Sequence, residues 1–440
     1  MSILSQVAQT MQTVLTTVAN HLGRKSGFIR RERKFTGEGY VQTLVFGWLA
    51  NPDATLEQLC QMAATLGIQM TPQSLEERLS RQSSEFMYQV LAAGVEQLIA
   101  SSPVAIPLLQ RFNGVYLQDS STIRLPDELK AIWIGCGGSD GSNTASSVKL
   151  HVRWDVLHGT LIGPMLQHGK DADLSSPLQL DTLPQGSLRL TDLGYFSLDD
   201  LEQLKDLGVY WLTRLKSQSD FYDEHGTRWD LVQFLQQHAS KQVDMPILLG
   251  AKKRVPCRLL GQRVPDEVAN ARRRRIRHAA RKKGGEPTQK TLFLAEWTLL
   301  VTTVEPERLS LTEAHVLMRT RWQIELLFKL WKTYGQVDTS RSQKPWRILT
   351  EVYAKLLGML LQHWIFLTSC WSSASRSLMK ASATVRSHAC TIALAFALGS
   401  LQRLLEALET IQRCLSQGCR LNKRKQNPNT YQLLLGGDIP

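Results

Sequence analysis

Between residues 113 and 215, the sequence predicts three antiparallel strands, followed by a strand, a helix and another strand. Apolar and polar residues alternate from Lys149 to Val156, as in a half-buried strand, and His158-Gly159 turns the chain into a further strand over 161–166. A short strand over 188–190 precedes a helix over 197–207, which Gly208 ends, and a buried strand over 209–212. This order predicts an α/β core built on a mixed sheet.

Two aspartates stand at strand ends in this core. Asp119 follows the apolar segment 115–117, and Asp192 follows the strand over 188–190. Two-metal phosphoryl transfer requires carboxylates from different elements, because hard divalent cations prefer oxygen ligands and must contact both the attacking and the leaving oxygen. Taken alone, each aspartate is equally explained as a turn residue.

A long helix is predicted from Ser310 to residue 334. Ser310 and Glu313 have capping-box spacing, and Gly335 can end the helix. At about 100° per residue, three charged side chains form one narrow stripe: Arg321, Glu325 and Lys332. The stripe could be a surface ion pair contributing a few tenths of a kcal/mol. Because most of the remaining surface is apolar, we expect the helix to be buried and the stripe to line a cleft. The apolar residues are Leu317, Met318, Trp322, Ile324, Leu326, Leu327, Phe328, Leu330 and Trp331.

The charge balance favours a polyanionic partner. With 52 Lys and Arg against 39 Asp and Glu, the formal net charge is +13, which is typical of proteins that bind nucleic acid or an anionic membrane surface. The most apolar stretch, over 356–371, is interrupted by Gln362 and His363, so we expect a core helix and no membrane partner. The seven scattered cysteines indicate reduced thiols and a cytoplasmic protein.

A basic tract occupies the segment 216–295, which follows no single period. Arg272, Arg273, Arg274 and Arg275 are consecutive. We expect a loop that follows DNA phosphates without reading sequence, and the alternative is a solvated loop that confers general solubility. Residues 54–79, nearer the N-terminus, have a helix-turn-helix outline, which is shared by DNA-reading motifs and ordinary helical hairpins.

Several segments, in the same order along the chain, resemble segments of one protein family. Arg321-x3-Glu325-x6-Lys332 matches the Tyr-x2-Arg-x3-Glu-x6-Lys signature of bacterial insertion-sequence DDE transposases of the YREK group, which includes the transposase of the kanamycin-resistance composite transposon. The resemblance extends to Tyr-Leu-Gln-Asp119-Ser-Ser, Thr191-Asp192-Leu-Gly-Tyr-Phe and Glu296-Trp297-Thr-Leu-Leu-Val-Thr, and covers roughly residues 110–335. One departure is Met318, which stands where the signature has Tyr.

The resemblance implies an architecture of five parts. A ribonuclease-H-like catalytic core over 106–215 and 299–345 is interrupted by a β-rich insertion with a basic loop over 216–298. A helical N-terminal DNA-binding domain over 1–105 and a C-terminal helical region over 346–440, with a possible role in oligomerisation, flank this core.

The resemblance also implies roles for individual residues. Asp119, Asp192 and Glu325 are expected to be catalytic and to bind two Mg²⁺ ions, with Mn²⁺ as a substitute. Arg321 and Lys332 are expected to bind phosphates near the transposon end. Trp297 stands at the place of a tryptophan that stacks on a base flipped out during hairpin formation, although a core aromatic explains it equally well.

The implied function is cut-and-paste DNA transposition through a hairpin intermediate. The expected partners are the inverted-repeat ends, the target DNA and a second copy of the chain in a synaptic complex, and the expected location is the bacterial cytoplasm at the nucleoid. Two alternatives remain. One is a transposase-derived DNA-binding protein with weakened or lost catalysis, which Met318 favours, because a thioether cannot donate a hydrogen bond to phosphate. The other is a ribonuclease-H-like nuclease without strand transfer.

Overall fold

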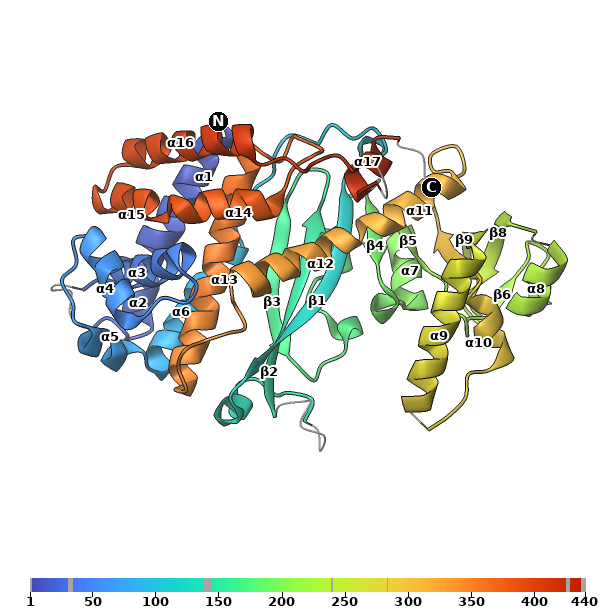
Figure 1. The fold of residues 1–440 in the computed structure, drawn as a ribbon, viewed down its shortest axis with the longest axis horizontal. Helices are drawn as coiled ribbons and strands as arrows, with labels where there is room; N and C mark the ends of the chain where they lie inside the picture. Colours follow the sequence, from blue (N-terminus) through green and yellow to red (C-terminus); the bar gives the residue numbers. More distant parts are fainter. Residues whose placement is uncertain are drawn as a thin grey trace.

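The computed structural model describes residues 2–30, 35–137, 145–238, 240–282, 284–424 and 428–436. The molecule is elongated, with a helical lobe at one end, a sheet through the middle and the segment 216–298, predicted to be an insertion, at the other end (Figure 1). A ten-stranded sheet runs in the order β3-β2-β1-β4-β5-β10-β9-β8-β6-β7. The predicted mixed α/β class is therefore confirmed at the level of a large sheet with flanking helices.

The first half of the sheet has the predicted strand order. Three antiparallel strands come first: β1 (Val115–Leu125), β2 (Ser146–Asp155) and β3 (Leu161–His168). β4 (Leu188–Thr191) then pairs parallel to β1, and after α7 (Leu198–Asp206), β5 (Tyr210–Arg214) pairs parallel to β4. Short 3-10 turns connect these elements: η2 (Leu109–Arg111), η3 (Asp127–Ala131), η4 (Asp173–Ser175), η5 (Leu180–Thr182) and η6 (Leu193–Tyr195).

The insertion extends the same sheet. β10 (Trp297–Thr302) pairs antiparallel with both β5 and β9 (Val255–Arg263), so the sheet is continuous from the core into the insertion. The remaining elements are β6 (Phe221–Tyr222), β7 (Arg228–Trp229), α8 (Leu231–His238), β8 (Gln242–Leu249), α9 (Asp266–Lys282) and α10 (Gln289–Leu294). A separate hydrophobic cluster, which includes Trp211, Phe234 and Trp297, stabilises this half.

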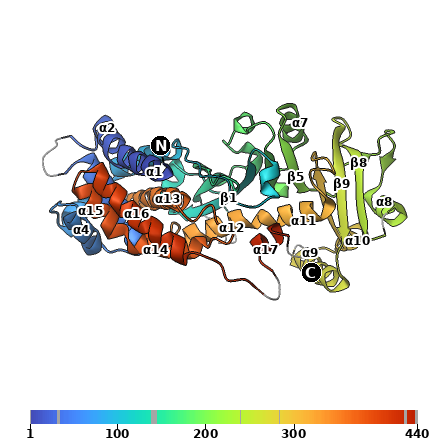
Figure 2. The same ribbon diagram turned by 90° about the horizontal axis from the view of Figure 1, so that it is seen from above.

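The predicted basic loop is wrong, because Arg272 to Arg275 lie within the 17-residue helix α9. Acidic residues occupy the first turn of α9 and basic residues its last turn, so their charges interact favourably with the helix dipole and stabilise the helix. Figure 2 shows α9 standing beside the insertion strands. A run of arginines is compatible with helix, since arginine is a good helix former and one face of α9 remains in solvent.

N- and C-terminal helices form one lobe. The N-terminal part contains α1 (Ile3–Gln12), η1 (Thr13–Val18), α2 (Ala19–Lys25), α3 (Gly37–Ala50), α4 (Leu56–Thr65), α5 (Pro72–Arg78) and α6 (Arg81–Val95). The C-terminal part contains α13 (Pro345–Leu367), α14 (Leu378–Ser387), α15 (Ala389–Ala397) and α16 (Leu401–Gly418). The last helix, α17 (Thr430–Leu434), lies outside this lobe. α13 packs against both α3 and α6, so the two ends of the chain share one core.

The most apolar stretch of the sequence lies in α13, which is buried from Leu349 to Leu367, as predicted for a core helix. Within the part of the chain that the structure describes, no helix is long and apolar enough to cross a membrane. The predicted helix-turn-helix outline is present as α4 and α5, separated by a turn at Gly67.

Candidate active site

Asp119 and Asp192 are brought side by side by the pairing of their strands. The parallel ladder between β1 and β4 ends with Gln118 opposite Thr191, and the two aspartates are the next residues of each strand. Asp192 caps the following turn, because its side chain accepts a hydrogen bond from the Leu193 amide at 2.7 Å. Asp192 directly follows its strand, as predicted, whereas Asp119, predicted at a strand end, lies within β1, which continues along β2 to Leu125.

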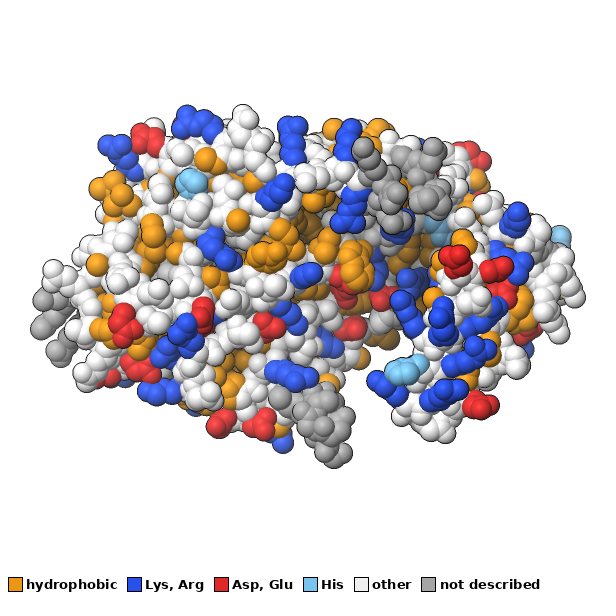
Figure 3. Space-filling model, viewed as in Figure 1, with side chains coloured by type: hydrophobic (Ala, Val, Ile, Leu, Met, Phe, Trp, Pro, Cys, Tyr) orange, Lys and Arg blue, Asp and Glu red, His pale blue; other side chains and the backbone are white. Residues whose placement is uncertain are grey.

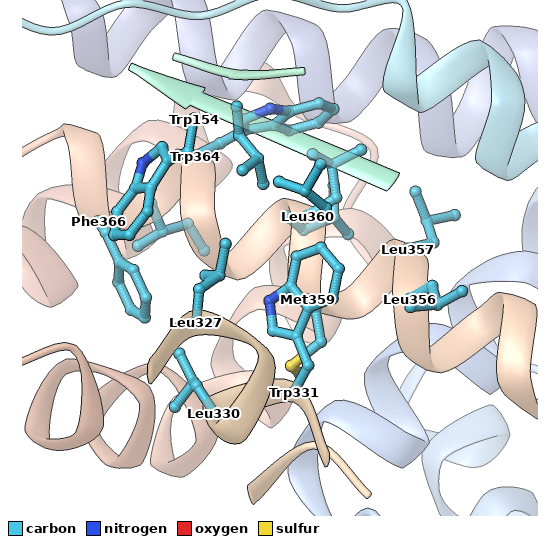
Figure 4. Close-up of a cluster of buried hydrophobic side chains, with 14 of the residues drawn as sticks. Trp154, Leu327, Leu330, Trp331, Leu356, Leu357, Met359, Leu360, Trp364 and Phe366 are labelled. Atoms are coloured by element: carbon cyan, nitrogen blue, oxygen red, sulfur yellow. The ribbon is translucent and has the colours of Figure 1, made fainter. Parts of the chain in front are cut away.

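Glu325 comes from the predicted long helix, which crosses the sheet in three pieces: α11 (Leu311–Thr320), α12 (Trp322–Lys329) and the π turn η7 (Leu330–Tyr334). The capping box of Ser310 and Glu313 is formed. Leu327, Leu330 and Trp331 belong to the same hydrophobic cluster as Met359 and Leu360 of α13, and Trp331 lies next to Met359 (Figure 4). Since a fully buried leucine contributes about 1.5–3 kcal/mol, this packing holds Glu325 firmly over the sheet.

Arg321, at the junction of α11 and α12, joins all three carboxylates. Its Nη2 lies 2.6 Å from Glu325 Oε1 and 3.9 Å from Asp192 Oδ2, and its Nη1 lies 3.2 Å from Asp119 Oδ2. The Arg321 side chain is only 10% exposed. The structure therefore brings together Asp119, Asp192, Glu325 and Arg321, four residues spread over more than 200 positions of the sequence.

The carboxyl of Asp119 is perturbed by its surroundings. Burial, together with the nearby Glu325 and Asp192 carboxylates, raises its pKa to about 6 against the lowering effects of the Ser120 amide and Arg321. A carboxyl with a raised pKa beside two other carboxyls indicates a site that lacks positive charge. A single guanidinium does not neutralise the three acids.

The donor set suits a divalent cation, although not in the arrangement seen. Three carboxylates arranged around one guanidinium supply the type of hard oxygen ligand that Mg²⁺ and Mn²⁺ prefer. Within the described ranges, no three acidic, histidine or cysteine side chains are close enough together to hold a metal ion. The Arg321 guanidinium lies between the carboxylates, so a cation fits only if that side chain turns away.

Lys332 lies farther along the helix than the carboxylate cluster. It belongs to η7, and its Nζ donates to the carbonyl of Thr122 on β1 at 2.8 Å. Burial lowers the pKa of this lysine, and Asp338 opposes the shift. Its ammonium is directed to β1, three residues beyond Asp119.

A cavity of about 560 Å³ separates α11 from the insertion, next to Arg321. Five arginines line it: Arg214, Arg263, Arg272, Arg319 and Arg321. Met318 also lines this cavity and is 8% exposed. The sequence analysis missed Arg214, Arg263 and Arg319, which come from three separate elements and share no local motif.

Trp322 is exposed, contrary to the prediction that it anchors the helix. Its exposed fraction is 56%, and it lines both the arginine-lined cavity and a second cavity of about 680 Å³ near α17. It precedes the buried Ile324 by two residues, which at about 100° per residue places it on the other side of the helix. The number of apolar residues along this helix did not distinguish its buried face from its exposed face.

Trp297 shows the opposite behaviour. It begins β10, is 6% exposed and packs in the hydrophobic cluster of the insertion. In this arrangement its indole is part of the core and is not available for stacking on a base.

The four arginines of the predicted basic tract fall into two pairs. Arg272 donates to the Trp297 carbonyl at 3.0 Å and to the Thr298 hydroxyl at 3.0 Å, which ties α9 to β10, and Arg273 pairs with Glu296, the residue before β10. Arg274 and Arg275 are exposed. Figure 3 shows Lys and Arg side chains gathered over α9, beside a hollow in the surface.

Comparison with known proteins gives a consistent result. The Transposase DDE domain family matches residues 110–361, which is more than half of the chain. The transposase for insertion sequence element IS231B of Bacillus thuringiensis subsp. berliner is 27% identical over 363 residues, covering 77% of this chain and 75% of that protein. The transposase for IS1151 of Clostridium perfringens is 26% identical over 383 residues, covering 80% and 78%.

Among solved structures, a piggyBac transposase in a synaptic complex with hairpin DNA aligns with 95% of this chain and 87% of its own. The TM-score is 0.47 and the sequence identity 8%, values too low to carry an argument about fold or mechanism.

Proposed function

This chain belongs to the DDE transposase family, and we propose that Asp119, Asp192 and Glu325 are the catalytic carboxylates of this DNA transposase. One observation carries the proposal: a single guanidinium, that of Arg321, lies within 3.9 Å of all three carboxylates. Side chains from two strands and a helix converge there, as a site for phosphoryl transfer requires. In this proposal the first part of the sheet and the α11–α12 helix form a ribonuclease-H-like core.

The proposed cofactor is a pair of Mg²⁺ ions, with Mn²⁺ as a substitute, held by the three carboxylates. When bound, the ions would activate the attacking oxygen and stabilise the leaving oxygen of the DNA phosphate. The raised pKa of Asp119 supports this assignment, because added positive charge is what would return that carboxyl to its ionised form.

Arg321 is proposed to exchange partners when DNA binds. In the free protein its guanidinium neutralises part of the acidic cluster, and its planar fork suits a phosphate as well as a carboxylate. We propose that it turns from Glu325 to the DNA backbone as the cations enter. Lys332 would then contact the same strand farther along β1.

DNA is proposed to enter through the arginine-lined cavity. Arg214 and Arg272 are close enough that Arg214 contributes to the lowered pKa of Arg272, so their charges repel each other in the free protein. A cluster of cations beside a phosphoryl-transfer site favours polyanionic DNA. The exposed Trp322 at its rim offers a face on which a displaced base can stack, and in this arrangement it replaces Trp297 in the proposed hairpin step.

A plasmid assay tests the function. The plasmid carries the terminal repeats that flank the gene, and the assay follows cleavage and joining in Mg²⁺. Strand-transfer products support a complete transposase, which the presence of all three carboxylates favours. Cleavage without joining would indicate a nuclease. A gel shift without cleavage would indicate a DNA-binding remnant, the candidate that Met318 favours.

A further inference from the structure

Backbone pairing brings Asp119 and Asp192 together but does not by itself fix the distance between their side chains. The ladder between β1 and β4 ends one residue earlier, at Gln118 and Thr191. Beyond that point β1 continues along β2 as far as Leu125, whereas the chain after Thr191 leaves the sheet and turns into η6. Some other contact must set the spacing of the two carboxylates.

Asp173 lies next to the two chain segments just beyond the end of this ladder. Its Oδ1 accepts a hydrogen bond from the Ser120 hydroxyl at 2.7 Å, and Ser120 is the residue directly after Asp119. Its Oδ2 lies against Gly194, two residues after Asp192, where an added Cβ would be only 3.0 Å away. One carboxylate therefore contacts the chain immediately beyond both aspartates, consistent with the packing of η4 on η6.

Asp173 lies on the face of the sheet opposite the carboxylate cluster. Successive side chains of a strand point to opposite faces, and Asp119 faces α12, where it meets Arg321. Ser120 consequently points to the other face, toward η4. On that face the Tyr195 hydroxyl lies 3.3 Å from Nδ1 of His151, which is opposite Ser120 in the β1–β2 ladder.

Lys149 holds Asp173 in place. Its Nζ lies 3.1 Å from Asp173 Oδ1 and also donates to the Asp171 carbonyl, so both ends of the short segment before η4 are tied to β2. The Lys149 side chain is 12% exposed, in contrast to the freely solvated partners of ordinary surface pairs. A partly buried cation and a hydroxyl that share one acceptor make the position of that acceptor better defined.

We propose that Asp173 is a positioning residue that sets the separation of Asp119 and Asp192 and thereby the affinity of the site for divalent cations. This inference rests on the proposed function of the three carboxylates. Residues that orient metal ligands through hydrogen bonds typically change metal affinity by about 10- to 100-fold when they are replaced.

The test measures Mn²⁺ binding to the full chain by electron paramagnetic resonance, alongside the Mn²⁺ concentration that half-saturates plasmid cleavage. Asp173→Asn should weaken Mn²⁺ binding by roughly tenfold or more, with the melting temperature of the metal-free protein and its DNA binding close to wild type. The matched control is Asp171→Asn, which removes one charge from the same segment and should bind Mn²⁺ like wild type. Ser120→Ala, which removes the hydroxyl donor, should shift binding in the same direction as Asp173→Asn and serves as the test if that variant does not fold.

Asp119→Asn separates the two possible failures. If it leaves Mn²⁺ binding unchanged, the proposed metal site itself is overturned. If Asp119→Asn weakens binding while Asp173→Asn or Ser120→Ala binds as tightly as wild type, only the positioning role is overturned. Equal weakening by Asp171→Asn would reduce the effect to general charge and would also overturn it.

Discussion

The guanidinium of Arg321 lies 2.6 Å from the carboxylate of Glu325, one turn farther along the same helix. An i,i+4 pair on an exposed helix contributes only a few tenths of a kcal/mol. Here the same guanidinium also reaches Asp119, and its side chain is 10% exposed. The pair thus belongs to a partly buried cluster in which one cation faces three acids.

Replacement of Arg321 should destabilise the metal-free protein. Without its guanidinium the carboxylates repel one another, and hydrogen bonds to charged groups contribute about 1.5–3 kcal/mol each. We expect Arg321→Ala to lower the melting temperature, and added Mg²⁺ to recover more stability in this variant than in wild type. Arg319→Ala, at an exposed position two residues earlier, is the control. Identical melting curves for Arg321→Ala and wild type would contradict the counter-charge role.

The two arginine pairs of α9 should behave differently. Arg274→Ala and Arg275→Ala alter exposed side chains, so each should weaken binding to any DNA and reduce the log-log salt slope by roughly 0.9 per lost phosphate contact. Arg272→Ala should in addition reduce stability, because it removes the bonds to β10. Salt-dependent binding and thermal unfolding of the three variants check this, and a selective loss on one DNA sequence would show that α9 reads bases.

The sequence predicted the positions of Asp192 and Glu325 on their elements, because each depends on local signals. A strand pattern ends next to Asp192, and a capping box and an apolar stripe define the helix that carries Glu325. The prediction that Asp119 ends its strand was wrong, because polar residues interrupt the apolar pattern there although β1 continues to Leu125. That Arg321 contacts all three could not be predicted, since it requires the helix to cross both strands.

The errors arose where tertiary packing decides between equal local patterns. Trp322 and Trp297 are both tryptophans in apolar segments, yet the first is exposed and the second buried, depending on which face the neighbouring elements cover. The charge of the arginine tract alone predicts a loop, but the contacts of Arg272 with β10 and of Arg273 with Glu296 make it one face of a packed helix.

Met318→Tyr should increase the affinity of the protein for DNA. Met318 lines the arginine-rich cavity, and a phenol there adds a donor for phosphate. A hydrogen bond to a charged group contributes about 1.5–3 kcal/mol before the entropy cost of ordering, so binding or cleavage of a cut transposon end should improve several-fold. Because Met318 is 8% exposed, a melting curve must accompany the binding measurement. No gain in a stably folded variant would show that DNA does not enter this cavity.

Trp322→Ala should reduce activity without reducing stability. The side chain is 56% exposed, so little packing is lost, whereas stacking on a base contributes about 1–3 kcal/mol. Fluorescence of 2-aminopurine placed near the scissile bond should report less base displacement than with wild type. If Trp297→Phe gave that result and Trp322→Ala did not, the stacking role would return to Trp297.

The stability of the protein should depend on pH through His158 in the turn between β2 and β3. A hydrogen bond to Asp155 raises the pKa of His158 above its usual 6.5. A raised pKa in the folded state stabilises the protein fully below pH 6.5, and this contribution is lost as the pH rises through the folded-state value. Because the imidazole is 30% exposed, the contribution should be only about 0.5–1 kcal/mol.

His158→Gln should therefore reduce stability at pH 5.5, measured by denaturant unfolding, and should have little effect at pH 8.5. His225→Gln, at an exposed position in the insertion, is the control. A loss of equal size at both pH values would show that packing, and not the charge of His158, stabilises this turn.

The central claim is that Asp119, Asp192 and Glu325 carry out metal-dependent DNA cleavage, and the most direct measurement compares wild type with Glu325→Gln on a plasmid bearing the terminal repeats. The variant keeps the size and the packing of the side chain but removes one carboxylate from the site. We predict that it binds the ends as wild type does, melts at a similar temperature and forms no cleaved product in Mg²⁺ or Mn²⁺. Cleavage at the wild-type rate by this variant would contradict the account.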